Sequence, residues 1–132
     1  MKCPCGSGAP EIACCERYHA GEPAPTALAL MRSRYTAFVR GAIDYLIETH
    51  DPATRGRVDA DDLAAFAKAT TWQGLEIVAT ERGGDDDETG IVEFIARGKT
   101  KGGAFAQRER SRFRKLDGRW YYTDGKVQHG QR

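Results

Sequence analysis

The sequence predicts an α+β fold, in which helices pack on a curved antiparallel sheet, with a small metal-binding segment at the N-terminus. Three observations lead to this prediction. All four cysteines lie among the first fifteen residues. Apolar residues recur at steps of three and four from residue 26 to residue 67, and the alternation typical of strands follows residue 74. Helices followed by antiparallel strands are the order typical of the α+β class.

The cysteines form two close pairs that suit a tetrahedral metal ion. Cys3 and Cys5 make one pair, Cys14 and Cys15 make the other, and eight residues separate them. The glycines in this spacer can adopt the positive φ angles that let a short segment reverse. Zinc binds four sulfur atoms at about 2.3 Å, so thiolates must reach one point from two directions. We therefore expect one structural zinc ion, held by all four cysteines and without an open position for catalysis.

Two disulfides are the alternative for these cysteines. Neighbouring cysteines rarely pair with each other, and clustered cysteines in a reducing compartment more often bind metal. The opening residues MKCPCGSG contain no apolar stretch, so no secretory signal and a cytoplasmic location are expected. His19, four residues beyond Cys15, is kept as an alternative ligand that could replace one cysteine.

Three helices are predicted after a connector. Residues 16–25 contain glycine and prolines without periodicity and are predicted to be the connector. The first helix spans 26–39, with Thr26 as its N-cap and a glycine just beyond its end. A second helix covers 42–48, and Asp51-Pro52 stops it. A third begins among the acidic residues 59–62, which suit a helix N-terminus, and continues through Ala67.

Four strands are predicted at 75–81, 90–99, 104–116 and 119–123, joined by glycine-rich turns. Asp117-Gly118 is a strong hairpin signal between the last two. This order of elements fits the nuclear transport factor 2-like (NTF2-like, or cystatin-like) cone, in which a curved sheet wraps a long first helix. We divide the chain into a zinc knuckle, 1–22, and an NTF2-like α+β domain, 23–132.

Composition restricts the class of protein. The chain has 132 residues, of which 40% are hydrophobic and 30% charged, as expected for one compact globular domain with a small appendage. No apolar run approaches the length of a membrane-spanning helix, so no membrane association is expected. The net charge of +1 argues against a protein that binds nucleic acid over its whole surface.

The strand at 104–116 separates two kinds of residue by its alternation. One face consists of Arg108, Arg110, Arg112 and Arg114. The other consists of Phe105, Gln107, Glu109, Ser111 and Phe113. Unpaired buried guanidinium groups are very costly, so the arginine face is expected outside and the phenylalanine face inside. Glu109 then needs a partner in the interior, and Arg32 or Arg34 of the first helix is the natural cation.

Two hypotheses follow for the concave side of the sheet. It either forms a pocket for a small molecule, or an Arg–Glu ion pair fills a closed cone. The pocket would be lined by Arg32, Arg34, Tyr35, Trp72, Gln107, Glu109 and Ser111. Glu109 could act as a general base only if burial raised its pKa. The histidines lie near the termini or at a helix end, so the sequence gives little support to an enzyme.

The outward arginines also allow two interpretations. They could form a basic patch that contacts the phosphate backbone of a nucleic acid. Alternatively, acidic neighbours, including 85–88, balance a solvated strand face. The near-zero net charge favours the second interpretation, and nucleic-acid contact stays the weaker one.

Several stretches resemble known families. CPCGSG…CC resembles the SEC-C motif, a short zinc-binding element also found at the tail of the SecA translocase, and its ligands map onto the four cysteines. LMRSRYTAF at 30–38 resembles the bacterial YchJ-like proteins of unknown function. Further similar stretches are 17–21, 23–27, 72, 75–77, 92–94, 108–113 and 118–122. Some relatives carry a second, C-terminal knuckle; residues 128–132 contain no cysteine, so a role that needs two knuckles is not expected here.

The resemblance implies the NTF2-like fold and contact with protein or ribosome partners. The expected function is that of a zinc-binding accessory protein that docks to a protein or ribonucleoprotein partner through the knuckle. The alternative is a small-molecule-binding protein or weak enzyme that uses the concave face around Glu109. The sequence leaves the oligomeric state open.

Overall fold

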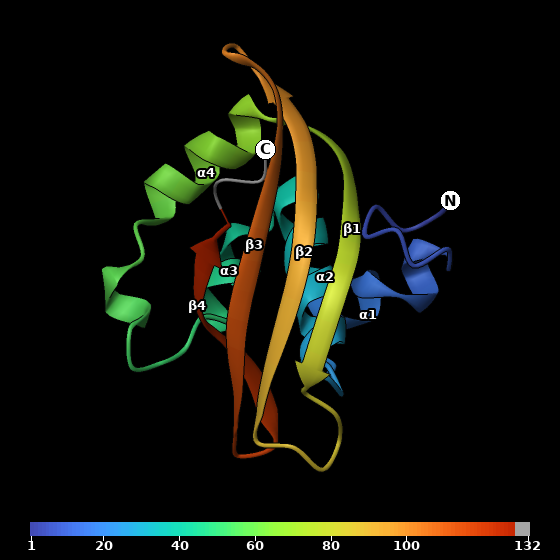
Figure 1. Ribbon diagram of the computed structural model, residues 1–132, viewed down its shortest axis with the longest axis vertical. Helices are drawn as coiled ribbons and strands as arrows, with labels where there is room; N and C mark the ends of the chain where they lie inside the picture. Colours follow the sequence, from blue (N-terminus) through green and yellow to red (C-terminus); the bar gives the residue numbers. More distant parts are fainter. Residues whose placement is uncertain (129–132) are drawn as a thin grey trace.

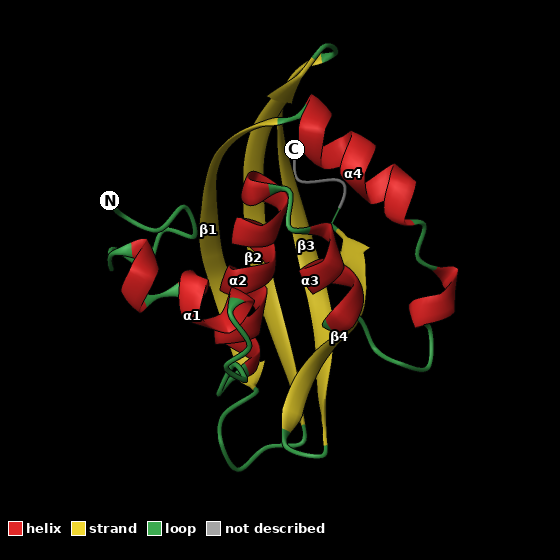
Figure 2. Ribbon diagram, turned by 180° about the vertical axis from the view of Figure 1, so that it is seen from behind, coloured by secondary structure: helices red, strands yellow, loops and turns green. Residues whose placement is uncertain are grey.

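The computed structural model describes residues 1–128. One antiparallel sheet has its strands in sequence order, β1-β2-β3-β4. The strands are β1 (Thr71–Arg82), β2 (Thr89–Thr100), β3 (Gly103–Leu116) and β4 (Arg119–Val127). The helices lie on one face of this sheet, which curves around them (Figures 1 and 2). The predicted NTF2-like α+β fold is confirmed; residues 129–132 of the predicted domain lie outside the described part of the chain.

The helices begin and end where local sequence signals predict. In α2 (Ala27–Arg40), the Thr26 side chain accepts a hydrogen bond from the Ala29 amide at 3.0 Å, and Gly41 ends the helix at φ 72°. The next helix is α3 (Ile43–Glu48). In α4 (Ala60–Ala69), the Asp59 carboxylate caps the N-terminus by accepting from the Asp62 amide at 3.1 Å.

The main core lies between α2 and the concave face of the sheet. Its buried side chains include Leu30, Met31, Tyr35, Val92, Phe94, Phe113 and Trp120. Burial of one such side chain stabilises the fold by about 1.5–3 kcal/mol. The Trp120 indole also donates to the Pro25 carbonyl at 3.3 Å, so the chain just before α2 is held to β4. The core therefore fixes the position of α2 across the sheet.

Two strand boundaries differ from the prediction. β1 begins at Thr71 rather than Leu75, because an irregularity at Gly74, where φ is 138°, lets the strand continue through the predicted turn. β4 continues to Val127 rather than ending at Thr123. Gly125 weakens the strand signal there, yet it is needed for packing, since a Cβ atom at this position would lie 1.9 Å from the Glu109 carboxylate.

The N-terminal segment is more ordered than the predicted connector. It contains a 3₁₀ turn, η1 (Glu11–Ala13), and a short helix, α1 (Cys15–His19). The prediction that residues 16–25 form only a connector is therefore wrong for its first four residues. Tyr18 explains the difference, because its side chain is buried and belongs to the main core. Tyr18 thus anchors the N-terminal segment in the core of the NTF2-like domain, while Cys3, Cys5 and Cys15 form a separate buried cluster.

Within residues 1–128, no helix combines the length and the apolar character needed to cross a membrane.

Candidate metal centre and candidate ligand pocket

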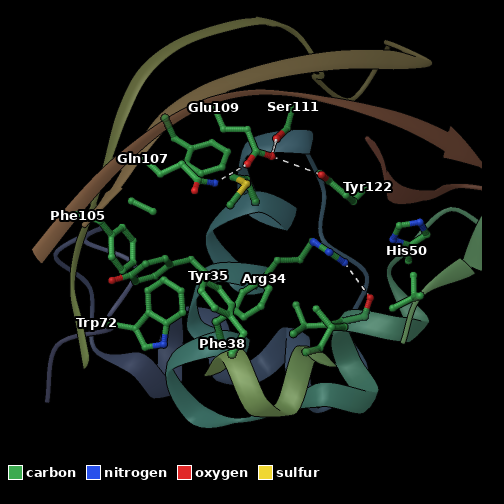
Figure 3. A pocket seen from close by; sticks show the side chains of 17 residues that line it. Arg34, Tyr35, Phe38, His50, Trp72, Phe105, Gln107, Glu109, Ser111 and Tyr122 are labelled. Carbon is green, nitrogen blue, oxygen red and sulfur yellow. Dashed lines mark hydrogen bonds between the residues drawn. The ribbon is translucent and has the colours of Figure 1, made fainter. Parts of the chain in front are cut away.

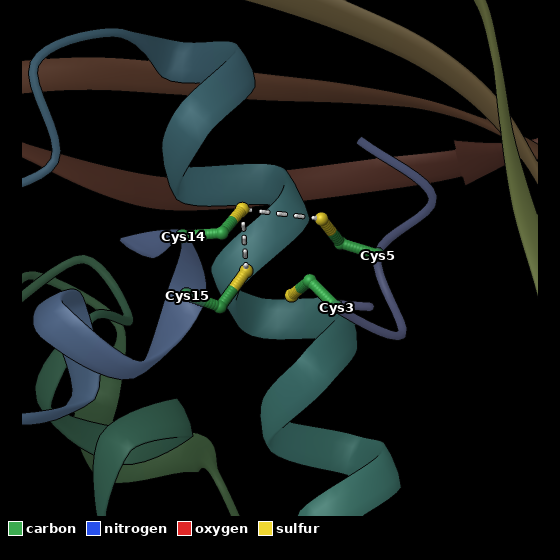
Figure 4. Close-up of side chains that lie close together, drawn as sticks. All are labelled: Cys3, Cys5, Cys14 and Cys15. Carbon is green, nitrogen blue, oxygen red and sulfur yellow. Dashed lines mark hydrogen bonds between the residues drawn. The ribbon is translucent and has the colours of Figure 1, made fainter. Parts of the chain in front are cut away.

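The four cysteines converge on one point beside α2 (Figure 4). Their sulfur atoms all lie within 4.8 Å of one another; the Sγ atoms of Cys5 and Cys14 are 3.6 Å apart and those of Cys14 and Cys15 are 3.9 Å apart. A tetrahedral ion with sulfur ligands at about 2.3 Å requires sulfur–sulfur distances of about 3.8 Å. All four cysteines are free rather than disulfide-bonded. The cluster can therefore hold a metal ion.

The electrostatics of the cluster also favour a cation. Cys3, Cys5 and Cys15 are buried, and Cys14 is half-buried. A hydrogen bond from the Cys15 thiol lowers the pKa of Cys5 to about 4, and the same contact raises the pKa of Cys15. One buried thiolate is thus stabilised at the expense of its neighbour. A divalent cation that binds every cysteine as thiolate removes this competition.

The knuckle is tied to the outer side of α2 by polar contacts. The Arg32 guanidinium donates to the Cys5 carbonyl at 2.7 Å, and the Cys3 Sγ atom lies 3.6 Å from the Thr36 hydroxyl. Farther along α2, Arg40 forms a two-bond ion pair with Glu11, which lowers the pKa of that carboxyl group. These contacts make α2 the support of the metal centre.

Two residues near the knuckle lie apart from the sites considered for them, Arg32 as a pocket residue and His19 as the alternative metal ligand. Arg32 does not line the pocket, because it lies two residues from Arg34, and two residues correspond to about 200° around a helix. His19 does not join the cysteine cluster. Its Nε2 atom lies 2.8 Å from the Ser33 carbonyl oxygen, and its ring packs 4.5 Å from the Tyr45 ring.

A cavity of about 270 Å³ lies between α2, the α3–α4 region and the concave face of the sheet (Figure 3). Its aromatic lining consists of Tyr35, Phe38, Phe66, Trp72 and Phe105. Its polar lining consists of Arg34, His50, Gln107, Glu109, Ser111 and Tyr122. Apart from Arg32, the side chains that the sequence placed in a pocket thus surround one cavity. Their functional role stays a prediction.

Glu109 is held over the cavity by neutral donors. The Ser111 hydroxyl and the Tyr122 hydroxyl donate to Oε2 at 2.9 and 3.4 Å, and the Gln107 amide donates to Oε1 at 3.2 Å. None of the cationic groups in the described chain lies within 4 Å of this carboxylate. The predicted ion pair between Glu109 and Arg32 or Arg34 is therefore absent from residues 1–128, and the cone is not filled by it.

Arg34 reaches the same cavity but uses other contacts. Its Nη1 atom donates to the Leu46 carbonyl at 2.9 Å and to the Thr49 hydroxyl at 2.7 Å, at the end of α3. Its guanidinium carbon lies 4.5 Å from the centre of the Tyr122 ring, within cation–π distance. Burial lowers the pKa of Arg34 to about 10, so the group stays charged at neutral pH.

Some lining residues were not predicted. His50 lies just beyond α3 and lines the cavity. Burial, and to a smaller extent the positive charge of Arg34, lowers the pKa of His50, which favours the neutral imidazole. Burial also raises the pKa of Tyr122 to about 12, so its hydroxyl stays a donor. Phe38 and Phe66 carried only the helical periodicity that usually marks a core. Chain folding, rather than a local motif, brings these side chains to the cavity.

The outward arginines of β3 are all paired. Arg108 and Arg110 contact Glu93, at 2.6 and 3.3 Å, and Arg110 also contacts Glu81. Arg112 pairs with Asp124. Arg114 binds both oxygens of Asp51, at 2.5 and 2.6 Å. The carboxylates of β1, β2, β4 and the α3–α4 loop, rather than those of 85–88, thus neutralise the candidate basic patch.

Comparisons with known proteins agree with this architecture. A family model described as the YchJ middle NTF2-like domain matches residues 26–125. The chain belongs to the YchJ-like family. A SEC-C motif containing protein from Rhodopseudomonas palustris, known from a solution structure, is 37% identical in sequence to this YchJ-like chain, and the TM-score between the two structures is 0.88. The match covers 98% of this chain and 100% of that protein.

A second SEC-C motif containing protein, from Psychrobacter arcticus, has a crystal structure that is 33% identical with a TM-score of 0.83. The match covers 98% of the YchJ-like chain and 84% of that protein. A variant of Rd1NTF2_05, 16% identical with a TM-score of 0.52 over 70% of this chain and 87% of the other, shows the fold alone. The predicted YchJ-like and SEC-C resemblance is confirmed.

Proposed function

We propose that this YchJ-like protein is a zinc-binding accessory protein that docks through its knuckle to a protein or ribonucleoprotein partner. The observation that carries the proposal is the convergence of four cysteine sulfur atoms to within 4.8 Å of one another. Softer thiolate ligands in a tetrahedral arrangement suit zinc. Four sulfur ligands leave no position for a reacting water molecule, so the ion has a structural role.

The surface of the knuckle supports a docking role. Met1 and Ile12 are 97% and 73% exposed, although both side chains are large and apolar. They belong to two adjacent backbone segments, since the Glu11 amide donates to the Met1 carbonyl at 3.0 Å. Exposed apolar side chains on a rigid support are typical of protein contacts. A protein surface is therefore the expected partner for this edge.

Two variants separate metal binding from docking. Ile12→Ser removes the exposed apolar side chain and leaves all four cysteines in place, whereas Cys14→Ser removes a ligand. Val78→Ser on β1 is the matched control, because Val78 is also exposed, at 37%. We expect a partner captured by the wild-type protein and the Val78 variant to be lost with either knuckle variant, while the Ile12 variant keeps its zinc. A partner retained equally by the Ile12 and Cys14 variants would contradict docking through the knuckle.

A second function is favoured by a separate observation, the open cavity that faces Glu109 and Arg34. We propose that this cavity binds a small molecule, because it is mostly apolar with a few convergent polar groups. Glu109→Gln should weaken ligand binding while partner capture through the knuckle is unchanged. If docking depends on the knuckle alone, Cys14→Ser should abolish partner capture and leave ligand binding in the pocket unchanged.

A further inference from the structure

Both charged groups of the pocket have hydrogen-bonding capacity that residues 1–128 do not use. A carboxylate offers about four lone-pair positions. Within residues 1–128, three of them are used, and the Glu109 Oε1 atom accepts only from Gln107. A guanidinium has five N–H donors. Arg34 uses those of Nη1, and no acceptor for its Nε or Nη2 atoms occurs within residues 1–128. One further donor and one further acceptor can therefore be bound.

The separation of these two charges is unusual for a protein interior. Arg34 is only 8% exposed, and a buried cation normally contacts a carboxylate. Glu109 lines the same cavity, yet the two side chains form no ion pair within 4 Å. Instead, neutral neighbours hold each group: the end of α3 and the Tyr122 ring hold Arg34, and Ser111 and the Tyr122 hydroxyl hold Glu109 (Figure 3). The walls present a positive and a negative group to a common space.

The rest of the cavity suits an aromatic ring. Tyr35 and Phe66 approach the Trp72 ring edge-on, at 5.7 and 5.5 Å between ring centres, and Phe105 lies beside them. Edge-to-face packing at such distances is favourable for aromatic groups. The volume of about 270 Å³ is near the lower end of the range of small-molecule pockets, roughly 300–1,000 Å³. This space suits one ring with a short polar head.

We propose that the pocket binds a small aromatic zwitterion, of which an α-amino acid with an aromatic side chain is the simplest member. The ammonium group donates to Glu109, the carboxylate accepts from Arg34, and the ring packs against Trp72. This inference rests on the small-molecule function proposed above for the pocket. The head group provides the ion pairs that Glu109 and Arg34 lack within residues 1–128, and the neutral His50 adds no competing charge.

Gly125 supports the assignment of Glu109 as a placed recognition group. It lies opposite Ser111 in the β3–β4 pairing. A Cβ atom here would lie 1.9 Å from Glu109 Oε2 and 2.8 Å from the Tyr122 hydroxyl. Gly125→Ala therefore displaces the Glu109 carboxylate without removing it, and provides a second variant besides Glu109→Gln.

The test is a titration of ¹⁵N-labelled zinc-loaded protein with L-phenylalanine, phenethylamine and 3-phenylpropanoate. The last two compounds each lack one half of the zwitterion. The indole N–H signal of Trp72 reports on the pocket, and that of Trp120, which donates to Pro25, is an internal reference outside it. We expect L-phenylalanine to shift the Trp72 signal alone, and each half-compound to bind at least about tenfold more weakly.

The variants complete the test. In Glu109→Gln, L-phenylalanine and 3-phenylpropanoate should bind with equal affinity, because the ammonium group has lost its partner. Gly125→Ala should weaken L-phenylalanine but not indole, a neutral ring without the head. A half-compound that binds the wild type as tightly as L-phenylalanine overturns the zwitterion inference. Binding of indole alone also overturns it while preserving the small-molecule pocket, and no shift with any compound contradicts both proposals.

Discussion

The two faces of β3 differ in whether their charged side chains form ion pairs within the described chain. On the outward face, each of the four arginines has a carboxylate partner from the chain itself, although exposed ion pairs contribute little to stability. On the inward side, Glu109 and the buried Arg34 share a cavity without pairing, where an unpaired charge is most costly. The cysteine cluster resembles the inward side, since its four sulfur atoms have only neutral partners and one another within residues 1–128, and no cation.

This difference separates interactions that complete the fold from those that need a ligand. The outward pairs account for their charges without any external group. The cysteine cluster and the pocket contain polar groups that lack such partners. A metal ion would bind the thiolates of the cluster, and a small molecule would pair with Glu109 and Arg34 in the pocket. The comparison predicts that substitutions in the outward ion pairs change the stability of the fold. Substitutions in the cysteine cluster or the pocket should change the binding of the metal ion or the small molecule.

The largest effect is expected at the metal cluster. Cys15→Ser removes a buried ligand, and loss of a structural zinc ion should lower the free energy of unfolding by more than about 4 kcal/mol. Chelation of the wild-type protein should lower the thermal midpoint in the same way. Thermal unfolding with and without chelator checks this; a midpoint unaffected by both changes would show that the cluster holds no stabilising ion.

The next effect is expected at Asp51, the only outward partner in the described chain that is itself fully buried, at 2% exposed. Asp51→Asn should cost about 2 kcal/mol, less than a fully buried pair, because the Arg114 side chain is 38% exposed. Chemical denaturation at pH 7 measures this loss. Equal stability of the variant and the wild type would contradict the structural role of the pair.

Asp51 also predicts a pH dependence. The hydrogen bonds from Arg114 lower its pKa to about 2, below the value of about 3.9 for an unfolded chain. Its contribution is therefore present above about pH 4 and is lost as the pH falls through about 2. Denaturation between pH 5 and pH 2 should show a weaker dependence in Asp51→Asn than in the wild type.

A smaller effect on stability is expected at Glu109. Glu109→Gln keeps the shape of the side chain and breaks no ion pair within 4 Å, so the free energy of unfolding should change by less than about 1 kcal/mol. Ligand binding should nevertheless fall. A large loss of stability without any effect on binding would show that Glu109 completes the fold instead of recognising a ligand.

The smallest effect is expected at Asp124. Its pair with Arg112 is solvent-exposed on both sides, at 53% and 65%. Asp124→Asn should leave the unfolding midpoint within experimental error, because exposed pairs are screened by water and salt. A loss as large as that of Asp51→Asn would remove the distinction between the two outward pairs.

The sequence predicted those parts of the molecule that depend on local spacing. The cysteine ligands lie within one short segment, so their spacing alone shows that they can meet. Thr26 and Asp59 cap their helices through contacts only three residues long. The alternation of β3 likewise separated the inward residues from the arginines, since the two faces follow from strand geometry.

Contacts between distant elements could not be predicted in this way. Whether Arg32 or Arg34 faces the pocket depends on the rotation of α2, which the knuckle and the core fix together. The partner of Arg114 is Asp51, 63 residues away, and no local pattern links them. Trp72 was expected in the pocket, but its neighbour Phe66 comes from α4, whose placement across the cavity is a property of the whole fold.

The most direct test of the central claim is the metal content of the protein, purified without added zinc, together with the number of thiols released by a chelator. One zinc ion per chain and four thiols that react only after chelation are the predicted result. This outcome would establish the closed site formed by Cys3, Cys5, Cys14 and Cys15. No metal and four freely reactive thiols would contradict it, and with it the docking function assigned to the knuckle.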